Sequence, residues 1–90
     1  MKTVHLLIKG QVQGVFYRAT AKDVAKLSEL KGWIKNTDDG SVEALITGDD
    51  EKVAEFIEWS KQGPARAEVS EVVVTEHEVE EFEKFSVIRD

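Results

Sequence analysis

Residues 3–30, TVHLLIKGQVQGVFYRATAKDVAKLSEL, contain the change in hydrophobic period on which the fold prediction rests. Every second residue from Val4 to Ile8 is apolar, which predicts a strand over residues 3–9 with one buried face. Two glycines within residues 10–14 then predict a loop. From about residue 18 to residue 30 the apolar side chains recur at helical spacing. The stretch therefore predicts a strand, a loop and an amphipathic helix in succession.

The rest of the chain continues the alternation of strands and helices. We expect a strand over 33–36, a turn over 37–40, a strand over 41–47, a helix from about 48 to 61, and strands over 69–75 and 85–88. This order is βαββαβ with a short additional C-terminal strand. Two helices on one face of an antiparallel sheet form the ferredoxin-like α+β sandwich, and residues 1–90 are expected to form one domain. In that arrangement the strand that ends at Asn36 can lie beside the first strand.

The composition excludes several classes of function. The 90 residues include 12 lysines and arginines against 18 aspartates and glutamates, a formal net charge of −6, which argues against binding to nucleic acid. The sequence has no cysteine, so disulfides, zinc knuckles and a CxxC metal site are excluded. Its two histidines, His5 and His77, are far apart and lack HxxxH or HxH spacing, so we expect no metal site built on imidazole. No apolar run approaches the ~20 residues that span a bilayer, so we expect a cytoplasmic protein with no membrane partner.

The loop that joins the first strand to the first helix has the features of an anion-binding site. A helix N-terminus offers backbone N–H groups without partners and the positive end of the helix dipole. Gly14 would let a ligand approach the backbone, and the Arg18 guanidinium suits two oxygens of a phosphate or a carboxylate. The same spacing fits a plain strand–helix connection with a surface arginine equally well. Three lysines are expected to surround the loop and offset the negative background: Lys9, Lys22 and Lys35.

Asn36, at the end of the predicted strand over 33–36, is a second candidate. Its amide both donates and accepts hydrogen bonds, which suits the orientation of a water molecule. An asparagine at a turn more often satisfies its own backbone than it takes part in catalysis. Spacing alone therefore favours the turn interpretation.

Two stretches resemble the signatures of a known family. Residues 10–18, GQVQGVFYR, resemble the GxVQGVxxR signature of the acylphosphatases. Residues 32–36 and 39–43, GWIKN and DGSVE, resemble that family's GWVxNxxDGxVE signature, and the resemblance extends over about residues 4–89. It implies hydrolysis of the carboxyl–phosphate anhydride of small acyl phosphates to a carboxylate and inorganic phosphate, without a metal or cofactor.

The resemblance also implies a role for each site residue. Arg18 would bind the phosphoryl group, and Asn36 would position the attacking water. The remaining phosphoryl oxygens would be held by the backbone amides of a loop that consists of Gln13, Gly14, Val15, Phe16, Tyr17 and Arg18. Inorganic phosphate would then be both the product and a competing ligand, and nothing requires more than a monomer.

The chain departs from the family where the first helix ends. Ser28 and Glu29 stand where the family usually has a Leu-Gly pair, so this helix must end by another route.

Other functions of this fold require different residues. A non-catalytic anion-binding or regulatory module would keep the loop but needs no water-orienting amide, so Arg18 together with Asn36 favours catalysis. An RNA-binding module needs basic and aromatic residues on the sheet, and a metal chaperone needs a CxxC pair. The sequence has neither the RNA-binding motif nor a cysteine.

Overall fold

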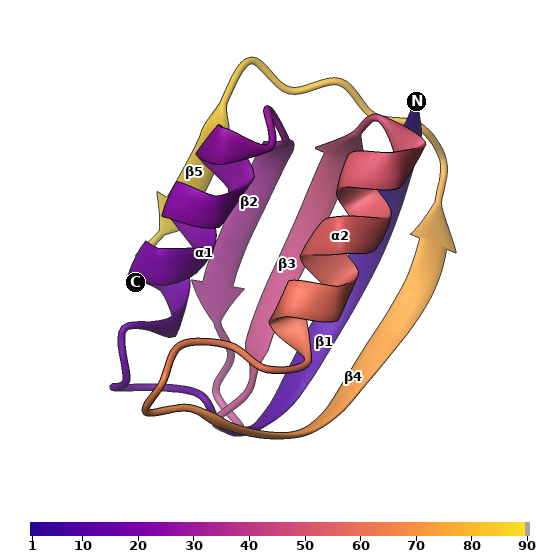
Figure 1. The fold of residues 1–90 in the computed structure, drawn as a ribbon. Helices are drawn as coiled ribbons and strands as arrows, with labels where there is room; N and C mark the ends of the chain where they lie inside the picture. The colour runs from indigo at the N-terminus through magenta and orange to yellow at the C-terminus, as the bar shows by residue number, and fades with distance from the viewer. Residues whose placement is uncertain (90) are drawn as a thin grey trace.

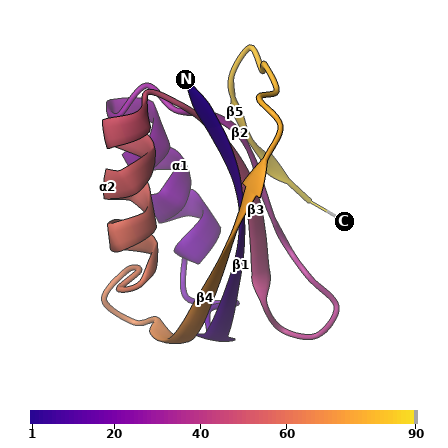
Figure 2. The same cartoon turned by 90° about the vertical axis from the view of Figure 1, so that its right-hand side faces the viewer.

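The computed structural model describes residues 1–89. Its elements follow the predicted order: β1 (Lys2–Gln11), α1 (Tyr17–Leu27), β2 (Lys31–Asn36), β3 (Val42–Gly48), α2 (Asp50–Ser60), β4 (Glu68–His77) and β5 (Phe85–Ile88). The strands form one 5-stranded sheet in the order β4-β1-β3-β2-β5. Both helices cover the same face of this sheet (Figure 1, Figure 2). The predicted ferredoxin-like fold with an additional C-terminal strand is confirmed.

The alternating apolar residues of β1 form the centre of the core. Val4, Leu6 and Ile8 are almost completely inaccessible to solvent. The antiparallel register pairs each of them with a buried residue of β3, namely Ile46, Ala44 and Val42. The helices close this core from above with Ala21, Ala25, Val53 and Phe56. Burial of each large aliphatic side chain contributes roughly 1.5–3 kcal/mol, so the two-residue period decides which face of the sheet the helices cover.

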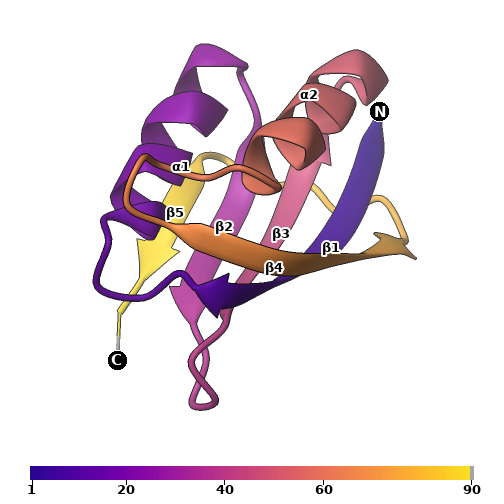
Figure 3. The same cartoon turned by 60° about the horizontal axis from the view of Figure 1, so that its bottom comes forward.

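The strand that carries Asn36 does not lie beside β1, and that expectation was wrong. β3 lies between β1 and β2 and is antiparallel to both. The reason is that α1 returns the chain across the helical face and leaves room for a third strand between the two it connects. Strands that are antiparallel to one neighbour run parallel to each other, so β1 and β2 still end at the same edge of the sheet. Figure 3 shows the start of α1 and the end of β5 at this edge too.

β5 makes the sheet mixed, where an antiparallel sheet was expected. It pairs with β2 in parallel, from Gly32 opposite Phe85 to Lys35 opposite Ile88. This register carries the end of β5 to the edge where Asn36 lies. The C-terminal strand therefore contributes to the surroundings of the predicted site, which its short length in the sequence did not indicate.

Gly10 belongs to β1 and not to the predicted loop. The strand continues to Gln11, with a shift of register towards β4 between Lys9 and Gly10. A Cβ atom at Gly10 would lie 2.1 Å from the carbonyl oxygen of Glu68, and the residue has φ +129°. Glycine is needed here because the backbone of β4 approaches too closely for any side chain.

α1 ends at Leu27, three residues before the predicted end, and it ends without a glycine. Glu29 has φ 57°, in the left-handed region. Its amide donates to the carbonyl of Lys26 (3.2 Å), and the amide of Leu30 donates to that of Ala25 (2.8 Å). These two hydrogen bonds form a Schellman motif, in which glycine is the usual left-handed residue. Glu29 thus takes the left-handed position of this motif without a glycine.

The side chain of Gln13 ties the loop after β1 to the turn between β2 and β3. Its Nε2 donates to the carbonyl oxygens of Thr37 and Ser41, both at 2.8 Å. One amide therefore bridges both ends of the turn that follows Asn36. The sequence predicted a role only for the backbone of Gln13, because the signature says nothing of where its side chain points.

We predict that Glu29→Gly stabilises the protein by about 0.5–1 kcal/mol. Glycine relieves the left-handed strain of roughly 1–2 kcal/mol and loses part of that gain through its more flexible unfolded state. In a domain of this size, a gain of 1 kcal/mol raises Tm by roughly 4–8 °C. Glu29→Gln, which removes only the charge, should recover less, and Ser28→Gly should destabilise because Ser28 has φ −93°. A Glu29→Gly protein that melts below the parent would contradict the strain argument.

We predict that Gln13→Leu destabilises the fold by about 1–3 kcal/mol, since each lost hydrogen bond contributes roughly 0.5–1.5 kcal/mol. Urea unfolding followed by circular dichroism measures the change. Gln11→Leu is the matched control, because Gln11 is exposed and its substitution should change the free energy of unfolding by less than about 0.5 kcal/mol. Equal effects of the two substitutions would show that the Gln13 bridge contributes nothing.

Candidate active site

A cavity of about 350 Å³ opens at the edge where β1 and β2 end. The loop after β1, the first turn of α1, the end of β2 and the segment after β5 all contribute to it. Its lining consists of Val12, Gly14, Phe16, Tyr17, Arg18, Ala19, Asn36 and Arg89. The structure thus brings Arg18 and Asn36 into one cavity. Of the predicted loop, Gln13 and Val15 do not line it.

Two residues of the loop have left-handed backbone conformations, Gly14 with φ 76° and Phe16 with φ 65°. A Cβ atom at Gly14 would meet nothing within 4 Å, so glycine is needed there for its conformation, and the backbone is open to a ligand. At Phe16 the same region costs roughly 1–2 kcal/mol, because a bulky L-residue crowds the following carbonyl. The loop is therefore bent at two places, one of them strained.

The bend leaves the start of α1 without a side-chain cap. The first hydrogen bond at the N-terminus of α1 runs from the amide of Thr20 to the carbonyl of Phe16, at 3.0 Å. The amides of the first turn before Thr20 have no acceptor within the helix. No acidic residue lies in that turn to offset the positive end of the helix dipole. An anion is the ligand that this end of the helix favours.

Arg18 is held by the end of β5. Its Nη1 donates to the carbonyl oxygen of Ile88 at 3.2 Å, and the side chain is partly exposed. A guanidinium has five N–H donors in a planar fork, so this contact leaves donors for two oxygens of a ligand. β5 therefore fixes the guanidinium beside the loop amides.

Arg89 is a second cation of the cavity, and sequence reasoning missed it. It follows the last predicted strand and belongs to neither signature. Its place depends on the parallel pairing of β5 with β2, for which the sequence carries no local signal. The cavity is thus lined by two arginines in a chain of net charge −6.

The expectation that three lysines surround the loop was wrong, since none of them lines the cavity. Lys9 and Lys35 alternate with core residues and so lie on the uncovered face of the sheet, where Lys9 pairs with Glu71 (3.9 Å) and Lys35 with Glu43 (3.7 Å). Lys22 lines a different cavity.

Asn36 does not behave as a turn residue that satisfies its own backbone. Its side-chain oxygen Oδ1 is buried and has no hydrogen-bond partner within residues 1–89. The turn is satisfied by Thr37 instead: its amide donates to the carbonyl of Ser41 (2.9 Å), and its hydroxyl accepts from the amide of Ser41 (3.0 Å). Hydrogen bonds from the Thr37 hydroxyl and from Ser41 lower the pKa of Asp39 in the same turn. The side-chain carbonyl of Asn36, a residue that lines the cavity, is left as a buried acceptor, at a cost of roughly 1–3 kcal/mol if it stays unpaired.

Tyr17 anchors the start of α1 in the core. Its ring packs against Trp59, with centroids 5.3 Å apart, and its hydroxyl donates to the carbonyl of Ser60 (2.8 Å). Burial raises the pKa of the Tyr17 hydroxyl, which stays protonated and serves as a donor. Its predicted contribution to the loop was through the backbone, and the side chain gives that backbone a rigid attachment to the end of α2.

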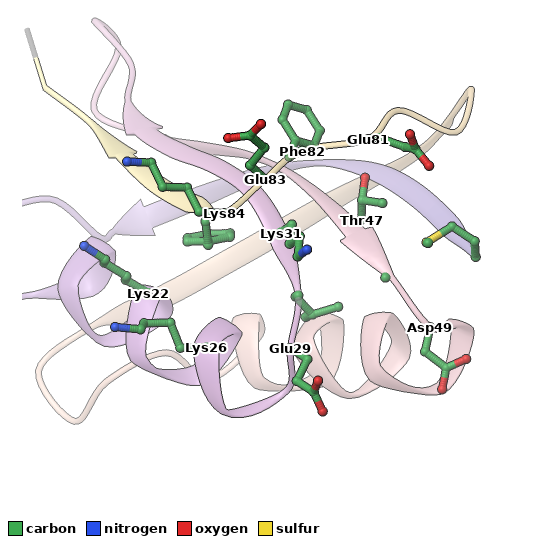
Figure 4. Close-up of a pocket in the computed structure, with 14 residues that line it drawn as sticks. Lys22, Lys26, Glu29, Lys31, Thr47, Asp49, Glu81, Phe82, Glu83 and Lys84 are labelled. Carbon is green, nitrogen blue, oxygen red and sulfur yellow. The ribbon is translucent and has the colours of Figure 1, made fainter.

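A larger cavity of about 960 Å³ lies at the opposite edge of the sheet, between the end of α1 and the segment before β5. Figure 4 shows Lys22, Lys26 and Lys84 towards one end of it and Asp49 and Glu81 towards the other. Neither Arg18 nor Asn36 lines this cavity, so size alone does not identify the site.

Within residues 1–89, no three His, Cys, Asp or Glu side chains come together as metal ligands would. Neither α1 nor α2 is long and apolar enough to cross a membrane.

The sequence of the chain matches a known protein family. The acylphosphatase family model matches residues 4–87. Acylphosphatase of Thiobacillus denitrificans is 47% identical over 88 residues, which are 96% of this chain and 99% of that protein. Acylphosphatase of Methylococcus capsulatus is 45% identical over 91 residues, covering 100% of this chain and 99% of the relative.

A solved structure shows the same architecture. The crystal structure of acylphosphatase from Bacillus subtilis superimposes with a TM-score of 0.95 at 34% identity, and the match covers 99% of this chain and 100% of that one. Fold, length and sequence therefore agree over nearly all of the described residues. The chain belongs to the acylphosphatase family and is an enzyme that hydrolyses acyl phosphates.

Proposed function

We propose that hydrolysis takes place in the 350 Å³ cavity, with the phosphoryl group bound by Arg18 and by backbone amides of the loop over residues 13–18. A phosphoryl group carries charge on three oxygens, which need several donors at once. The Arg18 fork and the uncapped start of α1 supply such donors at one edge of the sheet. Arg89 adds a second positive charge to the same cavity.

In this proposal Asn36 positions the attacking water. The observation that carries the assignment is the side-chain Oδ1 of Asn36, which is buried and has no partner among the described residues, in a residue that lines the same cavity as Arg18. An acceptor of this kind binds a water hydrogen and directs the oxygen lone pair away from itself, towards the phosphorus. Buried polar atoms are almost always paired, so a water at this position also removes the cost of the unpaired carbonyl.

The reaction needs no further catalytic group from the protein. The water oxygen attacks phosphorus, the bond between phosphorus and the bridging oxygen breaks, and that oxygen leaves with its electron pair as a carboxylate. A carboxylate is a weak base, so no general acid is needed to protonate it. The attacking water loses one proton to solvent and the other product is inorganic phosphate. Catalysis by positioning and charge stabilisation suffices for phosphoryl transfer of this kind.

The proposal includes further features that follow from the sequence. The enzyme acts as a monomer and a single domain over residues 1–90, in the cytoplasm, without nucleic acid, metal or cofactor. Inorganic phosphate competes with the substrate for the same donors. A non-catalytic anion-binding module needs no group that orients a water, so it gives no role to the unpaired side-chain carbonyl of Asn36. We therefore favour the catalytic assignment.

The two proposed roles predict different defects. Arg18→Ala should lower kcat/KM for benzoyl phosphate by about 10³-fold or more and also weaken phosphate binding, the scale of arginines that serve phosphoryl transfer. Arg18→Lys should recover little, because a lysine lacks the planar fork. Asn36→Ala should lower kcat by about 10²-fold while inorganic phosphate binds nearly as before. Phosphate release and isothermal calorimetry measure the two effects.

Lys26→Ala is the matched control, since it removes a cation that lines the larger cavity and should leave activity unchanged. Thermal melting must first show that each variant is folded. If folded Asn36→Ala loses phosphate affinity as badly as Arg18→Ala, or if it keeps full kcat, the assignment of the water to Asn36 is wrong.

A further inference from the structure

The side chain of Phe16 does not pack in the hydrophobic core. The residue is 70% exposed, although phenylalanine is among the residues most often buried. Its backbone adopts φ 65° and ψ 23°, a conformation that bulky residues avoid. The next residue, Tyr17, is 2% exposed and packs in the core. Adjacent aromatic residues thus point in opposite directions, and only Tyr17 contributes to the hydrophobic core.

The exposed ring belongs to the cavity that holds Arg18 and Asn36. Among the apolar residues that line this cavity, Val12 and Tyr17 are buried, and Ala19 and Gly14 are small. Phe16 therefore offers the largest accessible apolar surface next to the candidate phosphoryl site. Strained residues cluster at functional sites, and an observed outlier is a reason to ask what the strain serves.

An acyl phosphate has two parts, and the residues assigned so far recognise only one of them. The two guanidinium groups and the loop amides suit the phosphoryl oxygens, whereas the acyl group requires an apolar contact. We propose that Phe16 is the acyl-recognition residue, whose ring packs against an aromatic or extended apolar acyl group. The inference rests on the proposed function and adds a substrate class to it: acyl phosphates with such acyl groups are preferred to acetyl phosphate.

The size of the preference follows from the geometry. A ring that is open to solvent on one side buries one face against the substrate, and an aromatic pair of this kind contributes about two- to tenfold in affinity. The contact exists both before and during the reaction, because the acyl group does not change shape when the anhydride bond breaks. It should therefore appear in KM, with kcat nearly unchanged.

Phe16→Asn is the informative substitution, since asparagine tolerates the left-handed conformation but removes the ring. We expect KM for benzoyl phosphate to rise about two- to tenfold, and KM for acetyl phosphate to stay nearly unchanged. Phe16→Tyr keeps the ring and should keep the KM for benzoyl phosphate within about twofold of the parent. Phe16→Gly removes the ring by a second route and should reproduce Phe16→Asn. Phe82→Asn, which removes a phenylalanine at the larger cavity, is the matched control and should leave both KM values unchanged.

Two results would overturn the inference: equal changes of KM for the two substrates, or no change for either of them in Phe16→Asn and Phe16→Gly. Failure of the proposed function would look different. In that case folded Arg18→Ala would keep its activity on both substrates, whatever the Phe16 variants do. Calorimetry with inorganic phosphate separates the roles further, because Phe16→Asn should bind phosphate as the parent does and Arg18→Ala should not.

Discussion

The pairing of β3 with both β1 and β2 is the constraint on which the rest of the structure depends. Ala44 of β3 lies opposite Leu6 of β1 on one side and Ile34 of β2 on the other, and all three are completely buried. A slip of one residue in either pairing would turn an apolar row to solvent, so the register is strongly specified. Because this register ends β1 and β2 at one edge, it brings the loop before α1 to Asn36.

The same edge carries the features that a stable fold would not select. The side-chain carbonyl of Asn36 is buried without a partner in the described chain, Phe16 is strained and exposed, and α1 starts without a side-chain cap. Each feature costs stability, and each would gain from a bound acyl phosphate or water. Local rules of sequence and structure fail together most often at functional sites. Around them hydrogen bonds tie the segments together, from the Tyr17 hydroxyl to Ser60 and from the Gln13 side chain to the β2–β3 turn.

Most of the fold could be predicted from the sequence, because the alternation in β1 and the helical periods directly reflect which faces are buried. Glu29 shows one limit, since hydrogen bonds in a Schellman motif end α1 at a residue whose type does not indicate a helix end. Asn36 and Arg89 show another. The order of strands, and with it the place of Arg89, depends on long-range pairing. The side-chain carbonyl of Asn36 is unpaired because Thr37, and not Asn36, makes the hydrogen bonds that close the turn. No local sequence pattern indicates this division.

In the proposed mechanism the 350 Å³ cavity, and not the larger one, binds the phosphoryl group. Titration of ¹⁵N-labelled protein with inorganic phosphate tests it most directly, since backbone amide shifts report which N–H groups meet the anion. We expect the largest saturable shifts at the amides of residues 14–18, accompanied by the side-chain resonances of Arg18. Shifts confined to Lys22, Lys26 and Lys84, which line the larger cavity, would contradict the account.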